Sequence, residues 1–256
     1  MNIKINKIIH VRVKNYLNST SYIIFAIMLF FLASTQVFTY KSIPNFWNNF
    51  YYSIGNGITN TIFFCLLFVN TIIFIREKKL DHYLYNRLGK HEFKIKYDLY
   101  SIIIVNVFLF LIFIIFNISF SILISFNNFN ITMSKYNIIM PIQITIEIIK
   151  YLLYVILTSL FIGLSINVNG LMRKILFLIF ILMTIIPTTQ NFVINNIFES
   201  SIQYTFFINH MNYISINTDL ISTVLNMNFI LIVNILLYKA TLNKKVDILW
   251  NINLMC

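Results

Sequence analysis

Six apolar blocks near 20 residues long dominate the sequence, at about 21–40, 54–75, 101–126, 142–168, 175–188 and 223–238. A helix of about 20 residues crosses the roughly 30 Å hydrocarbon core of a bilayer. The composition agrees, because 11% of the 256 residues are charged, whereas soluble domains carry about 25%. The sequence therefore predicts an all-α polytopic membrane protein, with six transmembrane helices in a single transmembrane domain over 1–256.

Residues 1–19, before the first block, have the pattern of an amphipathic helix. Four apolar side chains share one helical face and three lysines share another: Ile5, Ile9, Val13 and Tyr16 against Lys4, Lys7 and Lys14. Such a helix lies in the interface of a negatively charged leaflet. The alternative is the start of a cleaved signal peptide with its apolar core at 22–32. The further spans and a poor cleavage consensus favour the interfacial helix.

The distribution of positive charge predicts the orientation. If both termini are cytoplasmic, sixteen of the nineteen Lys and Arg residues lie on that side, and Lys41, Lys135 and Lys150 lie on the other. Cytoplasmic loops carry an excess of Lys and Arg, so this asymmetry favours both termini inside. Abundant Ile, Asn, Phe and Lys with only five glycines are typical of an AT-rich bacterial genome. We therefore expect a multi-pass protein of the bacterial plasma membrane. We expect its net charge of +11 to interact with membrane lipid and not with nucleic acid.

The longest charged segment, 76–100, lies between the second and third spans. It holds seven of the nineteen basic residues and four of the eight acidic ones. Leu80, Leu84 and Leu88 recur at spacings of four, and Gly89 follows where a helix commonly ends. A short amphipathic helix held between two spans is suited to contact another molecule. The alternative is that the leucines rest on the lipid interface while the charges are solvated.

Three other regions connect the spans. A polar, aromatic loop with Pro44 and Trp47 follows the first span, and a second polar loop precedes Pro141. Pro187 is expected to break the fifth span. The 35 or so residues after it are too polar to span and too apolar for an ordinary loop. We expect one or two short re-entrant helices there, packed against protein.

Polar residues within the spans allow two interpretations. Glu147 and Lys150 lie three apart in the fourth span and either line the outer end of a translocation path or form an i,i+3 pair at the headgroup level, which we favour. Asparagines also occur within three of the spans: Asn60, Asn70, Asn106, Asn117 and Asn234. They would bond across helices or line a polar path, although an Asn-rich composition alone accounts for their number.

Catalytic and nucleotide-binding motifs are absent from the sequence. None of the five glycines belongs to a GxxxxGK[ST] phosphate-binding loop, and there is no HExxH or GxSxG motif. The four histidines are scattered and form no Cys/His cluster. We therefore expect a non-catalytic chain with no cofactor of its own, so any energy from ATP must come through another chain.

The layout resembles the permease subunits of the ABC-2 type of ABC transporter. These have an amphipathic N-terminal helix, six spans, a main cytoplasmic loop between spans 2 and 3, and a re-entrant stretch between spans 5 and 6. The family's loop opens with a basic/acidic cluster, similar here to Arg76–Lys78, and continues with a leucine-bearing coupling helix, similar to 80–88. Family members often have Gly-Thr after the acidic residue and a Pro after the helix, where this chain has Lys79-Leu80 and Gly89-Lys90.

The resemblance implies a permease subunit of an ATP-driven exporter. It implies partner ATPase subunits that bind ATP and Mg²⁺, and a second permease, identical or paralogous. The expected cargo is an amphipathic peptide such as a toxin or bacteriocin, or another hydrophobic substrate. The residues it assigns to contact with the ATPase are Glu77, Lys78, Leu80, Asp81, Tyr83, Leu84 and Leu88. The alternative function is a stand-alone membrane immunity or sensor protein that acts by binding, without ATP.

Overall fold

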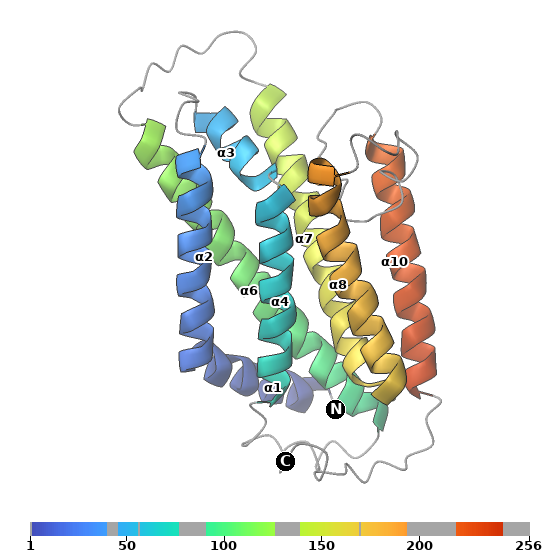
Figure 1. Cartoon of the computed structure of the whole chain (residues 1–256). Coiled ribbons are helices and arrows are strands. Elements are labelled where there is room, and N and C mark those ends of the chain that lie inside the picture. The colour runs from blue at the N-terminus through green and yellow to red at the C-terminus, as the bar shows by residue number, and fades with distance from the viewer. Residues whose placement is uncertain are drawn as a thin grey trace.

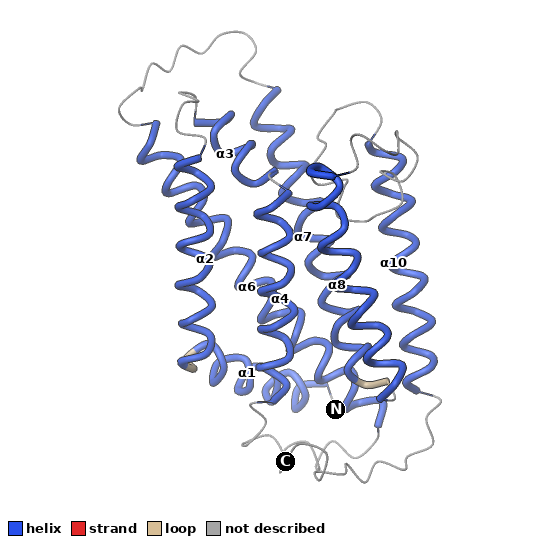
Figure 2. Tube along the Cα trace, viewed as in Figure 1, coloured by secondary structure: helices blue, strands red, loops and turns tan. Residues whose placement is uncertain are grey.

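The computed structural model describes residues 2–39, 46–55, 57–76, 91–125, 139–168, 170–193 and 219–242. These residues form helices joined by short turns, and they contain no strand (Figure 2). The helices in chain order are α1 (Asn2–Leu17), α2 (Thr20–Thr39), α3 (Phe46–Gly55), α4 (Gly57–Arg76), α6 (His91–Ser125), α7 (Ile139–Ile166), α8 (Gly170–Val193) and α10 (Asp219–Leu242). The longer helices form a bundle, and α1 lies across one end of it (Figure 1).

Four helical stretches of the described chain are long and apolar enough to cross a membrane: Thr20–Thr39, Thr59–Arg76, Phe93–Ile124 and Ile144–Ile166. Large apolar side chains also face outward, among them Ile24 and Phe31 on α2 and Leu236 on α10. Exposed apolar surface of this extent suits lipid and not water. These features indicate a membrane-embedded helical protein. The predicted fifth and sixth spans correspond to α8 and α10, in which Met227–Leu242 is a shorter apolar stretch, so the count of six stays a prediction.

The central helix is α6, which contacts α1, α2, α3, α4 and α7. It begins at His91, whereas the sequence placed the third span at 101–126. The helix starts early because no Gly or Pro interrupts 91–125. Its 35 residues are about 50 Å long, more than the roughly 30 Å of a hydrocarbon core. The last ten residues of the charged segment therefore form the first turns of a membrane helix.

Two other boundaries differ from the sequence-based expectations. The loop expected around Trp47 contains the helix α3, which buries Phe50 and includes Ile54, a residue assigned to the second span. The helix α8 also continues through Pro187 to Val193, so Pro187 does not end it. Membrane helices tolerate proline because neighbouring groups satisfy the freed carbonyl. The expected re-entrant helices fall mainly on 194–218, outside the described residues.

Part of the predicted apolar face of α1 packs against the bundle, whereas its place at a membrane interface stays a prediction. Ile9, Val13 and Tyr16 are buried against the bundle, and Lys14 is exposed. The chain turns between Leu17 and Thr20, where the Ser19 hydroxyl accepts a hydrogen bond from the backbone N–H of Tyr22 at 3.3 Å. A serine in this position satisfies an N–H group that the first turn of a helix leaves unpaired. This turn therefore places α1 across the end of the bundle and directs α2 into the bundle.

Close packing of α6 and α7 depends on Gly163. A Cβ atom at this position would lie 2.9 Å from Cδ2 of Leu99 and 3.1 Å from Cδ1 of Ile102. Both atoms are tips of flexible side chains, so an alanine forces them to rotate without moving the backbone. Small residues at membrane helix interfaces allow this kind of close approach.

We expect Gly163→Ala to destabilise the chain by about 1 kcal/mol, the low end of the cost of overpacking a core. Thermal unfolding of the detergent-solubilised chain measures this effect. Gly170→Ala is the matched control, because a Cβ at Gly170 has no atom within 4 Å. Equal stability of the two variants would contradict the close crossing of α6 and α7.

Candidate functional site

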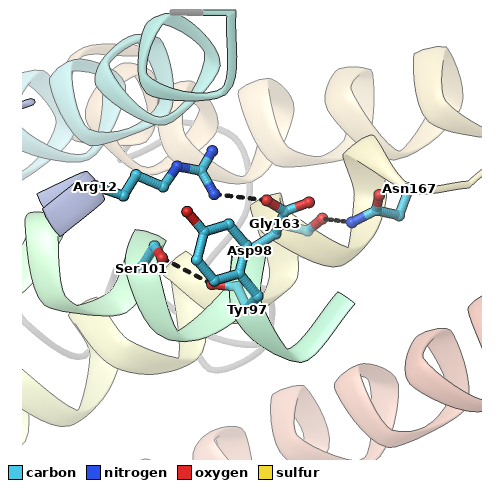
Figure 3. Close-up of polar contacts among 6 residues, drawn as sticks. All are labelled: Arg12, Tyr97, Asp98, Ser101, Gly163 and Asn167. Carbon is cyan, nitrogen blue, oxygen red and sulfur yellow. Dashed lines mark hydrogen bonds and ion pairs between the residues drawn. The ribbon is translucent and has the colours of Figure 1, made fainter. Parts of the chain in front are cut away.

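A buried ion pair joins α1 to α6 at the end of the bundle that α1 covers. Nη1 of Arg12 donates to Oδ1 of Asp98 at 2.7 Å, across 86 residues of sequence (Figure 3). The side chains are only 5% and 3% exposed. Charges removed from water in this way are costly unless they are paired. Each of these residues therefore constrains the position of the other, and α1 is fixed to α6 at this point.

The guanidinium of Arg12 also lies over two aromatic rings. Its Cζ atom is 4.4 Å from the centroid of Phe74, in the last turn of α4, and 4.9 Å from that of Tyr97 on α6. Cation–π contacts of this kind contribute about 0.5–2 kcal/mol, more when desolvated. Arg12 thus contacts both helices that flank segment 77–90. We name Arg12, Tyr16, Phe74, Tyr97 and Asp98 the α1 clamp.

The second residue that α1 contributes to the clamp is Tyr16. Its ring lies edge-on to Phe74 with centroids 4.8 Å apart, and its hydroxyl donates to Oδ1 of Asn70 on α4 at 2.7 Å. The contacts of Arg12 with Phe74, and of Phe74 with Tyr16, therefore continue to Asn70. This residue lies one helical turn before Phe74 on α4.

Asn70 belongs to a group of polar side chains between α4, α6 and α7. Nδ2 of Asn70 donates to Oδ1 of Asn106 at 3.0 Å, and Nδ2 of Asn106 donates to Thr71 Oγ1 and to Ser159 Oγ, each at 2.9 Å. All four residues are at most 1% exposed. We name Asn70, Thr71, Asn106 and Ser159 the asparagine network. Together with the α1 clamp, it forms a continuous chain of contacts across four helices.

The other asparagines within spans have different surroundings. Nδ2 of Asn234 on α10 donates to the carbonyl oxygen of Leu157 on α7 at 3.1 Å. Asn117 donates to the carbonyl of Phe113 in its own helix at 2.8 Å. The side chain of Asn60 has no hydrogen-bond partner among the described residues. Bonding across helices, one of the two roles considered from the sequence, thus holds for Asn70, Asn106 and Asn234.

The residues predicted to contact an ATPase all lie outside the described part of the chain: Glu77, Lys78, Leu80, Asp81, Tyr83, Leu84 and Leu88. The structure does place the ends of their segment, at Arg76 of α4 and His91 of α6. Glu147 and Lys150 both lie in α7. Lys150 is half-buried, whereas the side chain of Glu147 is outside the described residues, so both interpretations of this pair stay predictions.

Arg12 and Asp98 were missed as site residues, although the sequence carried a signal for each. Arg12 is three residues after Ile9 and four before Tyr16, which places it on the apolar face of its helix. Asp98 has Ile95 and Ile102 at the same spacings. A charge on a buried face requires a partner. Helical spacing was enough to indicate both burial sites, although neither was predicted, and it could not identify their pairing.

The α1 clamp and the asparagine network together join four helices of the bundle. No group of three or more His, Cys, Asp or Glu side chains in the described ranges could hold a metal ion. The polar atoms bond to one another across α1, α4, α6 and α7. Such contacts hold helices in a fixed relation, so displacement of one helix end is passed to the others.

Comparison of the chain with protein-family models, curated proteins and solved structures gives no match. Its function must therefore be inferred from its own residues.

Proposed function

We propose that this chain is the transmembrane permease subunit of an ATP-driven ABC exporter of the ABC-2 type. In this proposal α1, segment 77–90 and both termini are on the cytoplasmic side of a bacterial plasma membrane. Two permease chains, identical or paralogous, form the transport path, and two ATPase subunits bind ATP and Mg²⁺ below them. The cargo is an amphipathic peptide or another hydrophobic substrate. The chain itself catalyses no reaction.

The observation that supports this proposal is the position of Arg12. Its guanidinium contacts Phe74 near the end of α4 and pairs with Asp98 near the start of α6. These two helices carry the two ends of segment 77–90. A load applied to that segment by a partner therefore reaches α1, α4 and α6 together. Such an anchored, short connection is what a lever between a motor and a membrane bundle requires.

The asparagine network supports the same role deeper in the bundle. Asn106 lies eight residues after Asp98 on α6, which is about 12 Å along a helix. Its bonds to Thr71 and Ser159 tie α6 to α4 and α7 at that depth. Motion of the α6 end thus displaces several helices as a unit, as a change of access across the membrane requires.

Leu84→Asp tests the coupling to an ATPase. If 80–88 forms a helix that buries its leucine stripe in a groove of the partner, loss of one buried leucine weakens association at least about tenfold. The measurements are co-purification of the ATPase subunit with the tagged chain and the rate of ATP hydrolysis by the complex. Asn86→Asp is the matched control, because it adds the same charge on the opposite helical face.

Two outcomes would count against the proposal. Undiminished binding and ATP turnover in Leu84→Asp would remove the coupling role of the stripe. Failure of any ATPase subunit to co-purify with the wild-type chain would favour the stand-alone immunity or sensor function.

The orientation of the chain has its own test, in which a cysteine replaces Asn86 in a Cys65→Ser, Cys256→Ser background. This cysteine should resist impermeant thiol reagents in whole cells and react with them in inverted membranes.

A further inference from the structure

The interface of α4 and α6 contains a second polar level, toward the end of the bundle opposite to α1 (Figure 1). Three side chains there have polar atoms with no hydrogen-bond partner among the described residues: Oγ1 of Thr59, both Oδ1 and Nδ2 of Asn60, and Oδ1 of Asn117. All three residues are at most 1% exposed. We infer that Asn60 and Asn117 form a binding site for internal water. This inference does not depend on the proposed transport function.

Two contacts between α4 and α6 show that the asparagines lie at the same level. The asparagine network joins the helices at one point, and further along the rings of Phe63 and Phe113 stack with their centroids 4.8 Å apart. Residue numbers fall along α4 as they rise along α6, so the helices are antiparallel. Asn60 lies three residues before Phe63, and Asn117 lies four residues after Phe113, each on the face of its phenylalanine. The two asparagines are therefore opposite each other, one turn beyond the stacked rings.

The helix α3 encloses this level of the interface. It packs against α2, α4, α6 and α7, and its residues Asn49, Phe50 and Ser53 are at most 2% exposed. Ser121, one turn after Asn117 on α6, donates to Oδ1 of Asn49 at 3.0 Å. Asn117 therefore lies between the stacked rings and the contact with α3, where bulk water does not reach its amide.

The backbone of α4 cannot satisfy the side chains at its start. A buried hydroxyl further along the helix donates to the carbonyl four residues before it, as Thr71 does to Leu67 at 2.8 Å. Thr59 and Asn60 are the third and fourth residues of α4, so no residue of that helix lies four positions before either. Asn117 makes this bond through Nδ2, which leaves its Oδ1 atom over. Buried polar groups are nearly always bonded to protein or to ordered water, so these atoms require a further partner.

The chemistry of these atoms selects water as that partner. Nδ2 of Asn60 only donates, Oδ1 of Asn60 and of Asn117 only accept, and the hydroxyl of Thr59 does both. Water also donates and accepts, and an internal water makes about three hydrogen bonds to groups of this kind. A cation would leave Nδ2 of Asn60 without a partner, and an anion would face two amide oxygens. Water satisfies the whole set.

Radiolytic labelling of the full-length chain in detergent tests the site, because hydroxyl radicals formed from an internal water modify the side chains beside it. Tandem mass spectrometry of the digested chain locates the modified residues. We expect Phe63 and Phe113 to be labelled although both are 0% exposed. Phe25 is the control, since it is 4% exposed and lies on α2, away from the two asparagines, and it should stay unlabelled.

Leucine substitutions identify the groups that hold the water. In the double variant Asn60→Leu, Asn117→Leu, labelling of Phe63 and Phe113 should fall to the level of Phe25. Asn60→Leu alone should lower it more than Asn117→Leu alone, because Asn60 supplies a donor and an acceptor, whereas Asn117 supplies one acceptor. Leucine has a similar size and no polar group to satisfy, so these variants should fold. If the double variant is not recovered as folded protein, the two single variants provide the comparison.

Three results would overturn the inference. Absence of label on Phe63 and Phe113 in the wild-type chain would show a dry interface, in which the two amides pair directly. Equal labelling of Phe25 would indicate general penetration of solvent into the bundle. Labelling that persists in the leucine variants would show that the asparagines do not hold the water.

Discussion

Replacement of Arg12 by methionine should destabilise the chain by about 3–5 kcal/mol, because it removes the guanidinium that pairs with the buried Asp98 carboxylate. The pair is 2.7 Å apart and its side chains are at most 5% exposed, so water cannot replace the lost guanidinium. The contacts of Arg12 with Phe74 and Tyr97 are lost as well. Equilibrium unfolding of the solubilised chain, followed by circular dichroism, measures the change.

The double variant Arg12→Met, Asp98→Leu distinguishes the pair from the packing around it. Replacement of both charges by apolar groups removes their desolvation cost, and such changes in buried pairs are often neutral or stabilising. We therefore expect the double variant to recover most of the stability lost in Arg12→Met. Additive losses in the double-mutant cycle would show that the two side chains do not interact.

A stable, uncharged double variant would also separate folding from transport. If the α1 clamp passes motion from segment 77–90 to α1, this variant should bind the ATPase subunit as the wild-type chain does but export cargo less well. Arg12→Met alone cannot show this, since its loss of stability would lower export for a different reason.

Asn106→Leu should cost about 2 kcal/mol, the second largest effect that we expect. The substitution keeps a side chain of similar shape but removes three hydrogen bonds, to Asn70, Thr71 and Ser159. Hydrogen bonds between membrane helices contribute about 0.6 kcal/mol each on average. The Nδ2 group of Asn70 would also lose its acceptor in a site that is closed to water. Unfolding in detergent by the same method gives the comparison.

Asn117→Leu is the control for Asn106→Leu. Both asparagines lie on α6 and both are buried, but Asn117 donates only to the carbonyl of Phe113 in its own helix. Its Oδ1 atom has no hydrogen-bond partner within the described residues. We expect a change within about 0.5 kcal/mol for this variant. If the two variants lose stability equally, the asparagine network does not hold the helices together.

The helices themselves were largely predictable from the sequence. The first four predicted spans match α2, α4, α6 and α7, apart from their boundaries. The largest differences are α3, the early start of α6 and the passage of α8 through Pro187. Each concerns a segment with polar residues or a proline. The secondary structure of such a segment depends on the surrounding protein and not on the helix propensity of its own residues.

The coupling residues that the sequence proposed lie at 77–88, outside the described residues, so their role stays a prediction. The structure adds how the two ends of that segment are held, through the contacts of Arg12 with α4 and α6. No local sequence pattern predicts these contacts. The spacing of Ile9, Arg12 and Tyr16 places Arg12 on the apolar face of α1, although its burial was not predicted from the sequence. That its partner would be Asp98 could not be read from spacing, because the two are separated by 86 residues.

Hydropathy and helical periodicity, which depend on residues a few positions apart, determined by themselves that this chain is helical, suited to a membrane and amphipathic at its N-terminus. Only the tertiary structure decided which polar side chains meet. Asn106 bonds across three helices while Asn117, on the same helix, bonds to its own backbone. The physical reason is that a buried polar group takes whichever partner the packing of neighbouring helices places within about 3 Å, and that packing joins segments far apart in the chain.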